Sequence, residues 1–394
     1  MNSLELFAGA GGLGMGLCSA GFHPVGVIEK DEDCCETIRQ NALRGAKQMR
    51  GWKLVGTDVK DVNFRVFEDK LDLVSGGPPC QPFSLGGKHR AYEDSRDMFP
   101  EAVRAIREIR PLAFIFENVK GLTRDRFRNY FEYIRLQLNH PDVRAEVDED
   151  WTDHLSRLER IEVSSVKGGL HYRVVTRVLN AADFGVPQKR ERVFFVGFRT
   201  DLGIEWNFPD PTHSREALLW DQSSQGSYWD RHKISKSPRF YAARDAHISP
   251  EQRLIPPSLL PWRTVRDQIA DLPEPETAKT SKLAISGHIY QPGARVYPGH
   301  TGSPLDEPAK ALKAGVHGVP GGENMIAHRN GSLRYFTMRE AARLQTFPDE
   351  FIFTGSWSET MRQLGNAVPV RLAEVIANHV GKDLSAFRSS KRVQ

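Results

Sequence analysis

Seven short apolar runs recur through residues 1–200, and they constrain the fold more than any other feature of the chain. Helix-like segments at residues 99–109 and 127–138 separate some of these runs. Strands that alternate with helices predict an α/β fold, in which a parallel sheet is covered by crossover helices. The runs lie at residues 4–7, 25–28, 54–55, 71–74, 112–116, 174–179 and 193–198.

The character of the chain changes after this region. The 394 residues, 39% of them hydrophobic, are enough for a large core and for two domains. From about residue 205 prolines and glycines are frequent and periodicity is lost, whereas helical patterns return at 337–345 and 370–380. We predict one domain of residues 1–200 plus 331–394 and a second, irregular domain of residues 201–330. The polar segment 140–170 is predicted to be a surface excursion.

Cysteine usage and hydropathy set the expected compartment. The four cysteines have neither disulfide nor zinc spacing, so we expect no metal and a reducing environment. No apolar stretch approaches the roughly 18 residues of a membrane span, and the N-terminal sequence lacks a signal-peptide pattern. We therefore predict a cytoplasmic protein. The net charge of +4 is compatible with nucleic acid but does not decide the matter.

The run GGPPCQPFS at residues 76–84 presents a cysteine just after an apolar run. Two prolines fix two φ angles and remove two backbone donors, so Cys80 cannot lie in the middle of a helix or strand. The glycine pair before them lets a ligand approach the backbone. A thiol displayed in this way is a candidate nucleophile, but most free cysteines are small buried hydrophobes. The loop alone supports the nucleophile and the buried-hydrophobe interpretations of Cys80 equally.

A glycine-rich turn follows the first apolar run, in the sequence LELFAGAGGLGMGL at residues 4–17. It allows close approach and exposes backbone N–H groups at a helix start. The next two runs lead to Glu29, placed to bind ribose hydroxyls, and to Asp58, which can accept from an adenine amino group. These features predict an adenosine site; the alternative is two solvated acids at helix starts. The absence of G-x-x-x-x-G-K disfavours ATP and leaves NAD open.

An ordered series of motifs resembles the DNA (cytosine-5)-methyltransferases of bacterial restriction–modification systems. The series is FAGAGGLG, Glu29, TDV at 57–59, PPCQPFS, ENV at 117–119, PQKRER at 187–192, REAARLQTFPD at 339–349 and GNAVP at 365–369. The resemblance implies a Rossmann-like methyltransferase domain that uses S-adenosylmethionine, with a smaller, irregular target-recognition domain. It implies double-stranded DNA as the substrate and a restriction endonuclease as the functional partner. We expect a monomer that does not associate with membranes.

The resemblance also implies how the chemistry proceeds. The thiolate of Cys80 would add to carbon 6 of a flipped-out cytosine and so activate carbon 5 toward a methyl sulfonium. Glu117, at the end of an apolar run, would give a proton to ring nitrogen 3. Arg192 would hold the cytosine oxygen and Glu117, Arg190 would steady the catalytic loop, and Asn118 would orient the prolines before the cysteine. The alternatives are a salt-bridged structural acid at Glu117 and a solvated charge run for KRER.

Further contacts follow from the matched motifs. The residues expected to contact the cofactor are Phe7, Ala8, Gly9, Gly11, Gly12, Leu13, Glu29, Asp58, Val59, Pro79, Asn366 and Val368. Phe7 has the alternative of a core aromatic, and GNAVP that of an ordinary helix start. The residues expected to contact DNA are Gln81, Ser84, Lys88, Arg90, Arg96, Gln188, Lys233, Arg239 and Leu312. Gln188 has a structural alternative, and the basic stretch 231–244 that of a charged surface loop.

The sequence departs from the family at one position, where Ala311 precedes Leu312 in place of the usual threonine.

Two other functions remain as alternatives. A transfer-RNA cytosine-5 methyltransferase is disfavoured by the long 201–330 domain, because the RNA-acting relatives carry a shorter, characteristic insert. A catalytically silent DNA-binding regulator is disfavoured by the presence of Cys80, Glu117 and Arg192.

Overall fold

The computed structural model describes residues 1–79, 97–164, 168–223, 226–234, 255–277, 285–295, 301–314, 322–328 and 330–391. The chain forms two compact units. The first comprises Met1–Leu179, Glu191–Pro209 and Ala373–Gln394, and the second comprises Asn180–Arg190 and Asp210–Leu372. Within the described ranges, none of the helices combines the length and the apolarity that a bilayer crossing requires.

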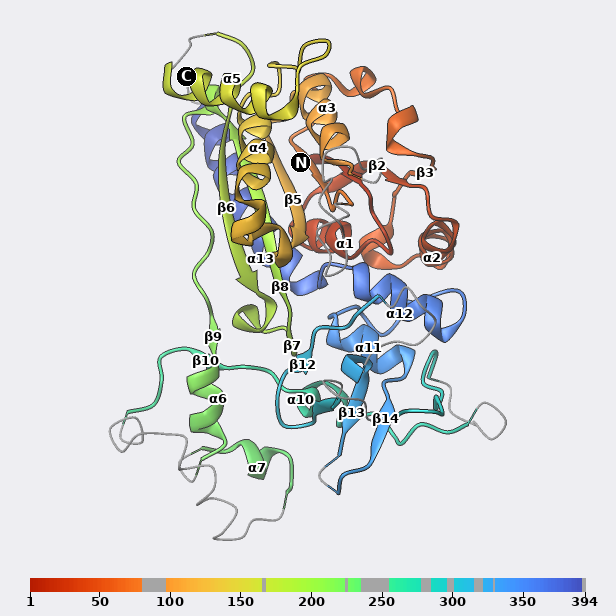
Figure 1. Ribbon diagram of the computed structural model, residues 1–394. Coiled ribbons are helices and arrows are strands. Elements are labelled where there is room, and N and C mark those ends of the chain that lie inside the picture. Colours follow the sequence, from red (N-terminus) through yellow and green to blue (C-terminus); the bar gives the residue numbers. More distant parts are fainter. Residues whose placement is uncertain are drawn as a thin grey trace. The chain divides into compact units, whose positions relative to one another are not determined.

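A seven-stranded sheet forms the centre of the first unit, with strand order β3-β2-β1-β4-β5-β8-β6 (Figure 1). Each of the seven apolar runs of the sequence overlaps one of these strands, and the expected α/β fold is confirmed. The strands are β1 (Asn2–Leu6), β2 (His23–Glu29), β3 (Leu54–Gly56), β4 (Leu73–Gly76), β5 (Ala113–Val119), β6 (Tyr172–Asn180) and β8 (Glu191–Arg199).

One strand runs against the predicted direction. The strands β1 to β5 pair in parallel, as expected, but β8 is antiparallel to β5, from Ala113 opposite Phe198 to Val119 opposite Arg192. A parallel pair needs a crossover connection of a dozen or more residues, usually a helix. Only the short segment 181–190 joins the end of β6 to the start of β8. This segment is too short for a crossover, so β8 starts at the edge of the sheet where β6 ends and runs back in the opposite direction. The prediction of an all-parallel sheet was wrong for this strand.

The direction in which the chain crosses the sheet reverses between β1 and β4. β2 and β3 lie on one side of β1, and β5, β8 and β6 lie on the other side of β4. In open α/β sheets, ligands bind beyond the carboxyl ends of strands at such a reversal. The two strands pack closely there, because a Cβ added to Gly76 would lie 2.5 Å from the carbonyl oxygen of Leu6. The loops that follow β1 and β4 therefore begin side by side.

Helices cover the sheet and complete the core of the first unit (Figure 1). They are α1 (Gly12–Ser19), α2 (Glu32–Leu43), α3 (Phe99–Ile109), α4 (Arg128–Asn139), α5 (Trp151–Ser164) and the part of α13 (Val370–Lys391) that follows residue 372. One apolar cluster joins α3 and α4 to the sheet, with Phe99 and Ile134 packed among Phe114, Phe116 and Leu6, all fully buried. Burial of such side chains contributes about 1.5–3 kcal/mol each.

The segment 140–170 is more ordered than the surface excursion that its composition predicted. Its helix α5 packs against α4 and buries Leu155 and Leu158. His154 also lies inside this contact, and its Nδ1 forms a hydrogen bond of 2.9 Å with the hydroxyl of Tyr133. Three inward-facing positions at helical spacing hold the insert on the domain even though many of its remaining residues are charged.

The second unit is built from short elements. They are β7 (Gln188–Lys189), β9 (His213–Ser214), α6 (Arg215–Asp221), α7 (Tyr228–Arg231), β10 (Leu260–Pro261), α10 (Val265–Ile269), β11 (Ser303–Pro304), β12 (Ala309–Lys310), β13 (Met325–Ala327), β14 (Leu333–Tyr335), α11 (Met338–Leu344) and α12 (Trp357–Asn366). A small core of Leu218, Tyr228 and Trp229 supports α6 and α7, and the indole N–H of Trp229 donates to the carbonyl of Gln222 at 2.7 Å.

The boundaries of the two units differ from the predicted ones in three segments. Residues 180–190 and 331–372 lie in the second unit instead of the first, and residues 201–209 lie in the first instead of the second. Strand β7 pairs with β12, which draws 180–190 into this unit, and α11 packs against α10, which draws in the segment after residue 330. The boundaries thus depend on strand pairing and helix packing between segments that are distant in the sequence. Such contacts cannot be predicted from local composition.

Candidate active site

Predicted functional residues lie at one edge of the sheet in the first unit. The glycine turn follows β1, Glu29 ends β2, Asp58 follows β3, and Gly77 follows β4. Glu117 lies in β5, near its carboxyl end. Because these strands are parallel, their carboxyl ends meet at the same edge. The antiparallel strand β8 begins at this edge and brings Arg192 opposite Val119.

The glycine turn departs from ordinary backbone geometry. Phe7, a half-buried residue that is not glycine, has φ = 53°, and Gly9 has φ = 54°. A left-handed conformation costs a bulky residue about 1–3 kcal/mol, and such strain concentrates at binding sites. A Cβ added to Gly9 would have no atom within 4 Å, so the backbone there borders open space. Gly11 precedes α1 and offers no side-chain cap, and the N–H of Gly14 in the first turn of this helix instead donates to Glu5 at 2.9 Å.

Glu29 links the end of β2 to this turn. Its Oε2 accepts a hydrogen bond from Gly9 N at 2.7 Å, and its Oε1 accepts from Lys30 N and Asp31 N, each at 2.8 Å. The carboxylate is therefore fixed by three backbone donors beside the open backbone of Gly9. A fixed carboxylate next to an open glycine turn is suited to bind a diol.

Asp58 has a similar position at the end of β3. Its carboxylate accepts from Lys60 N at 3.1 Å and pairs with Lys30 Nζ at 3.0 Å. The backbone N–H of Lys60, and then Lys30, hold the pKa of Asp58 below its usual value, so the group is ionised at neutral pH. The neighbouring Val59 is buried, and so are Ala8, Gly12 and Leu13, which the sequence also predicted to contact the cofactor. Their side chains therefore belong to the packing behind the site.

Sequence reasoning missed Glu5, a carboxyl group behind the glycine turn. Glu5 is 1% exposed, its Oε1 accepts from Gly14 N at 2.9 Å, and its Oε2 has no hydrogen-bond partner among the described residues. Burial raises the pKa of Glu5 to about 8, and the negative charge of Glu29 adds to the effect. The available signal was an acid within an otherwise apolar strand, in the run LELF.

Glu117 and Arg192 form an ion pair at the centre of this edge. Arg192 Nε lies 2.8 Å from Glu117 Oε1, and both side chains are largely buried. A Cβ added to Gly77 would lie 3.3 Å from Glu117 Oε2, so the carboxylate lies beside the start of the proline–cysteine loop. The contact with Arg192 fits the interpretation of Glu117 as a structural ion-paired acid. The position of the carboxylate beside this loop fits the interpretation as a catalytic acid.

Asn118 holds the same loop. Its Nδ2 donates to the carbonyl of Pro78 at 2.9 Å, and its Oδ1 accepts from Val119 N at 2.8 Å. The backbone N–H of Met98 donates to the carbonyl of Pro79 at 2.9 Å, so the chain on the far side of the loop returns to its start. The six predicted residues of this loop lie outside the described ranges: Cys80, Gln81, Ser84, Lys88, Arg90 and Arg96.

In the second unit, Arg190 and Gln188 join distant segments. The fully buried guanidinium of Arg190 donates to the carbonyls of Leu312 at 3.1 Å and Gly365 at 2.7 Å. Gln188 is also fully buried, and its Oε1 accepts from Leu312 N at 3.2 Å. This is the structural alternative that the sequence left open for Gln188. Buried side chains present no surface to DNA, so direct contacts by Gln188 and Leu312 are not carried into our proposal.

The remaining predicted residues of the second unit have mixed settings. Asn366 is exposed at the end of α12, whereas Val368, two residues later in the chain, is buried. Lys233 is exposed, but its neighbour Arg231 pairs with Asp221 at 2.8 Å, so part of the basic stretch serves the fold. Arg239 lies outside the described residues, and the half-buried Ala311 follows β12.

Comparison with known proteins identifies the family. The family model described as C-5 cytosine-specific DNA methylase matches residues 1–142 and 160–382. The chain belongs to this family. The resemblance that the motifs indicated is thereby confirmed, and the chain is a DNA cytosine-5 methyltransferase. The gap in the match, residues 143–159, falls on the segment that leads into α5 and on most of α5 itself.

Similar members of the family include bacterial modification enzymes. The chain is 33% identical over 381 residues to the Type II methyltransferase M.Eco47II of Escherichia coli, covering 96% of this chain and 78% of the relative. It is 33% identical over 386 residues to M.PspPI of Psychrobacter sp. (strain TA137), covering 97% and 79%. A solved DNA modification methyltransferase encoded within an E. coli prophage has a TM-score of 0.59 at 22% identity, covering 98% of this chain and 99% of that one. At that identity the likeness shows the fold alone.

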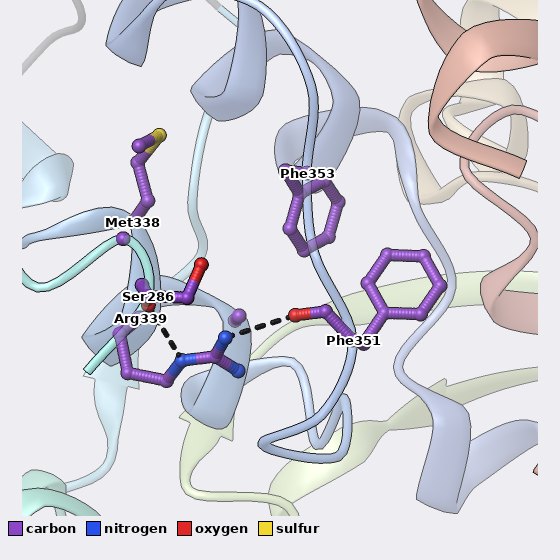
Figure 2. A pocket seen from close by; sticks show the side chains of 7 residues that line it. Ser286, Met338, Arg339, Phe351 and Phe353 are labelled. Carbon is purple, nitrogen blue, oxygen red and sulfur yellow. Dashed lines mark hydrogen bonds between the residues drawn. The ribbon is translucent and has the colours of Figure 1, made fainter. Parts of the chain in front are cut away.

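The family motif REAARLQTFPD has a structural role in this methyltransferase. The buried Arg339 donates to three carbonyls, those of Ser286 at 3.1 Å, Pro348 at 3.2 Å and Phe351 at 2.9 Å. Figure 2 shows its guanidinium between Ser286 and Phe351, with two of these bonds as dashed lines. Arg339 also lines a small cavity of about 40 Å³ with Met338. All described polar contacts of the guanidinium join loops of the second unit to α11, so we assign no ligand to this cavity.

Proposed function

We propose that this protein transfers a methyl group from S-adenosylmethionine to carbon 5 of cytosine within a specific sequence of double-stranded DNA. We further propose that it is the modification enzyme of a Type II restriction–modification system, with a restriction endonuclease as its functional partner. One observation carries the proposal: the Glu117–Arg192 pair lies beside Gly77, three residues before Cys80, at the sheet edge that also carries the glycine turn and Glu29.

The residues at this edge suit the cofactor. Glu29 would bind the ribose hydroxyls, Asp58 would accept from the adenine amino group, and the open backbone at Gly9 would let the ligand approach. Phe7, held in a strained conformation, would pack on the bound ligand. When bound, S-adenosylmethionine supplies an electrophilic methyl group on a sulfonium.

The chain's own residues would activate the base. The sulfur of Cys80 forms a bond to carbon 6 of cytosine, and the ring electrons move toward nitrogen 3, which takes a proton from Glu117. Carbon 5 of the resulting enamine becomes the nucleophile for the methyl group. After methyl transfer the proton on nitrogen 3 returns to Glu117. Water takes the carbon 5 proton, which restores the double bond between carbons 5 and 6 and expels the Cys80 thiolate. Arg192 holds Glu117 in place and can donate to the cytosine oxygen, while Asn118 holds the loop through Pro78.

The comparisons favour DNA over transfer RNA as the substrate. The curated relatives at 33% identity are named Type II methyltransferases. The Dnmt2 structure from S. pombe matches at 17% identity with a TM-score of 0.55, covering 98% of this chain and 99% of that one, a likeness of fold alone. We propose a monomeric protein of the bacterial cytoplasm, as the sequence predicted.

Bisulfite sequencing of DNA from cells that express the protein tests the proposal. The expected result is 5-methylcytosine at one recurring sequence, absent from cells that express Cys80→Ala. Duplexes that contain 5-fluorocytosine should also form a covalent adduct with the protein, since fluorine cannot leave as a cation. Unmethylated DNA with well-folded protein, or an adduct that persists in Cys80→Ala, would refute the proposal.

A further inference from the structure

A basic segment directly follows the strand that carries Glu117 and Asn118. Its sequence, KGLTRDRFR at residues 120–128, contains four basic residues and one acid. The segment forms two short turns, Lys120–Thr123 and Asp125–Phe127, and then enters α4 at Arg128. Because β5 is parallel to β4, this segment leaves the sheet at the edge where Gly77 and the ion pair of Glu117 lie.

Three arginines of this segment are exposed and have no carboxylate partner among the described residues. They are Arg124, Arg126 and Arg128. Other arginines of the same unit do serve the fold through ion pairs, such as Arg135 with Glu132 at 2.6 Å and Arg157 with Glu149 at 2.6 Å. The three exposed guanidinium groups lie within five residues, so this short segment carries positive charge that no carboxylate of the described residues neutralises.

The segment is held in place without using these charges. Leu122 is fully buried and anchors the first turn in the core. The guanidinium of Arg126 lies 4.5 Å from the ring centroid of Phe127, a cation–π contact that restricts its orientation. The first turn of α4 contains no acidic residue. These positive groups contribute no ion pair to the fold, and they lie at the sheet edge of the proposed site, so they are available there to attract an external anion.

We propose that Arg124, Arg126 and Arg128 contact phosphate groups of the DNA backbone next to the target cytosine. The proposal rests on the proposed function and adds a DNA contact surface on the catalytic unit, apart from the predicted loops. Guanidinium groups bind phosphate oxygens in a planar, two-pronged geometry. Contacts of this kind fix the position of a duplex but do not read its sequence. The surface should therefore contribute equally to binding of cognate and unrelated DNA.

The test is a salt titration of binding to a random-sequence DNA duplex. Each phosphate that a protein neutralises contributes about 0.9 to the slope of log K against log salt. The triple variant R124A/R126A/R128A should lower that slope by about 2.7 relative to the unchanged protein. The triple lysine variant should keep most of the slope, because an ammonium group also neutralises a phosphate. Thermal unfolding of both variants checks that they are folded.

A matched control lies at the opposite edge of the sheet. Arg44, Lys47 and Arg50 are also exposed, also lack ion pairs among the described residues, and precede the amino end of β3. R44A/K47A/R50A should keep the original slope and methylation rate. An unchanged slope in R124A/R126A/R128A, or an equal loss in the control, would overturn the inference. The proposed function is judged separately, by cytosine methylation with the unchanged protein.

Discussion

The carboxyl group of Glu5 accepts a hydrogen bond from the backbone N–H of Gly14 at 2.9 Å, across the base of the glycine turn. A Cβ at Gly14 would lie 1.7 Å from Glu5 Oε2 and 2.9 Å from the ring of Trp52. The contact joins strand β1 to helix α1, and the turn between them is the proposed cofactor site. The chemistry of Glu5 and the absence of a side chain at Gly14 therefore both set the shape of that site.

Gly14→Ala should destabilise the protein and weaken cofactor binding. Atoms that approach this closely cannot coexist, and overpacking of a tight core costs about 1–3 kcal/mol. Thermal unfolding measures the stability, and calorimetry with S-adenosylmethionine measures the affinity. Gly381→Ala is a control for the loss of glycine alone, because Gly381 also lies in a helix and an added Cβ there would come no nearer than 3.1 Å to another atom, the end of the flexible Met1 side chain. If both variants behave alike, the contact with Glu5 is not the cause.

Glu5 should make stability fall as pH rises. Its pKa is raised from 4.5 to about 8 in the folded state, so folded protein keeps a proton that unfolded protein loses. The stabilisation is complete below the unfolded pKa and is lost as pH rises through the folded pKa, with a slope of about 1.4 kcal/mol per pH unit. Denaturant titrations between the two pKa values measure it. Glu5→Gln, which is neutral at every pH, should remove this part of the slope, and identical slopes in both proteins would contradict the assignment.

The sequence predicts the seven strands of the sheet and helices such as α3, α4 and α13, because each depends on a local pattern. Buried strands such as β5 are continuous apolar runs, and α3 shows helical spacing at the residues predicted for it. The same edge of the sheet could be predicted for Glu29, Asp58 and Glu117 from their places after strands. The direction of a strand is different, because an apolar run looks the same in a parallel and an antiparallel strand. The strand at 193–198 was predicted for that reason, but its antiparallel direction was not.

Roles that depend on distant partners could not be predicted. Arg190 reaches carbonyls of Leu312 and Gly365, more than a hundred residues away, and nothing near Arg190 in the sequence indicates them. Arg339 similarly connects loops at Ser286 and Phe351. The motif resemblance marked these arginines as family positions, but only the contacts distinguish a structural bond from a contact with substrate.

Arg339→Lys should destabilise the second unit. The fork of Arg339 satisfies three carbonyls at once, which an ammonium group on a differently shaped side chain cannot reach together. A buried polar group left without a partner costs about 1–3 kcal/mol. Denaturant unfolding should show this loss, whereas Arg362→Ala, which removes an i,i+3 pair with Glu359, should cost less than about 1 kcal/mol. Equal effects would mean that the carbonyl contacts of Arg339 contribute little.

Asn118→Asp should slow methylation without weakening cofactor binding. The substitution replaces the donor to Pro78 with an acceptor, so the proline–cysteine loop loses a hydrogen bond and gains repulsion. A loss of about 1–3 kcal/mol corresponds to a rate lower by roughly 5- to 150-fold. Single-turnover kinetics measure the rate, and calorimetry with S-adenosylmethionine measures the affinity. A fall in affinity with an unchanged rate would place Asn118 in the cofactor site instead of the catalytic loop.

Glu29→Ala should weaken S-adenosylmethionine binding for two reasons. The variant removes the carboxylate proposed to hold the ribose, and it leaves the backbone N–H groups of Gly9, Lys30 and Asp31 without their acceptor. Loss of a hydrogen bond to a charged group costs about 1.5–3 kcal/mol, an affinity lower by roughly 10- to 150-fold.

Glu29→Gln separates the two reasons. The amide oxygen can still accept from Gly9 and so keep the turn in shape, but it has no charge for the ribose diol. If Gln restores most of the affinity, Glu29 acts mainly by shaping the turn. If Gln is as weak as Ala while thermal stability is restored, the carboxylate itself binds the ligand. Unchanged affinity in both variants would remove Glu29 from the proposed site, because no other acid ends β2.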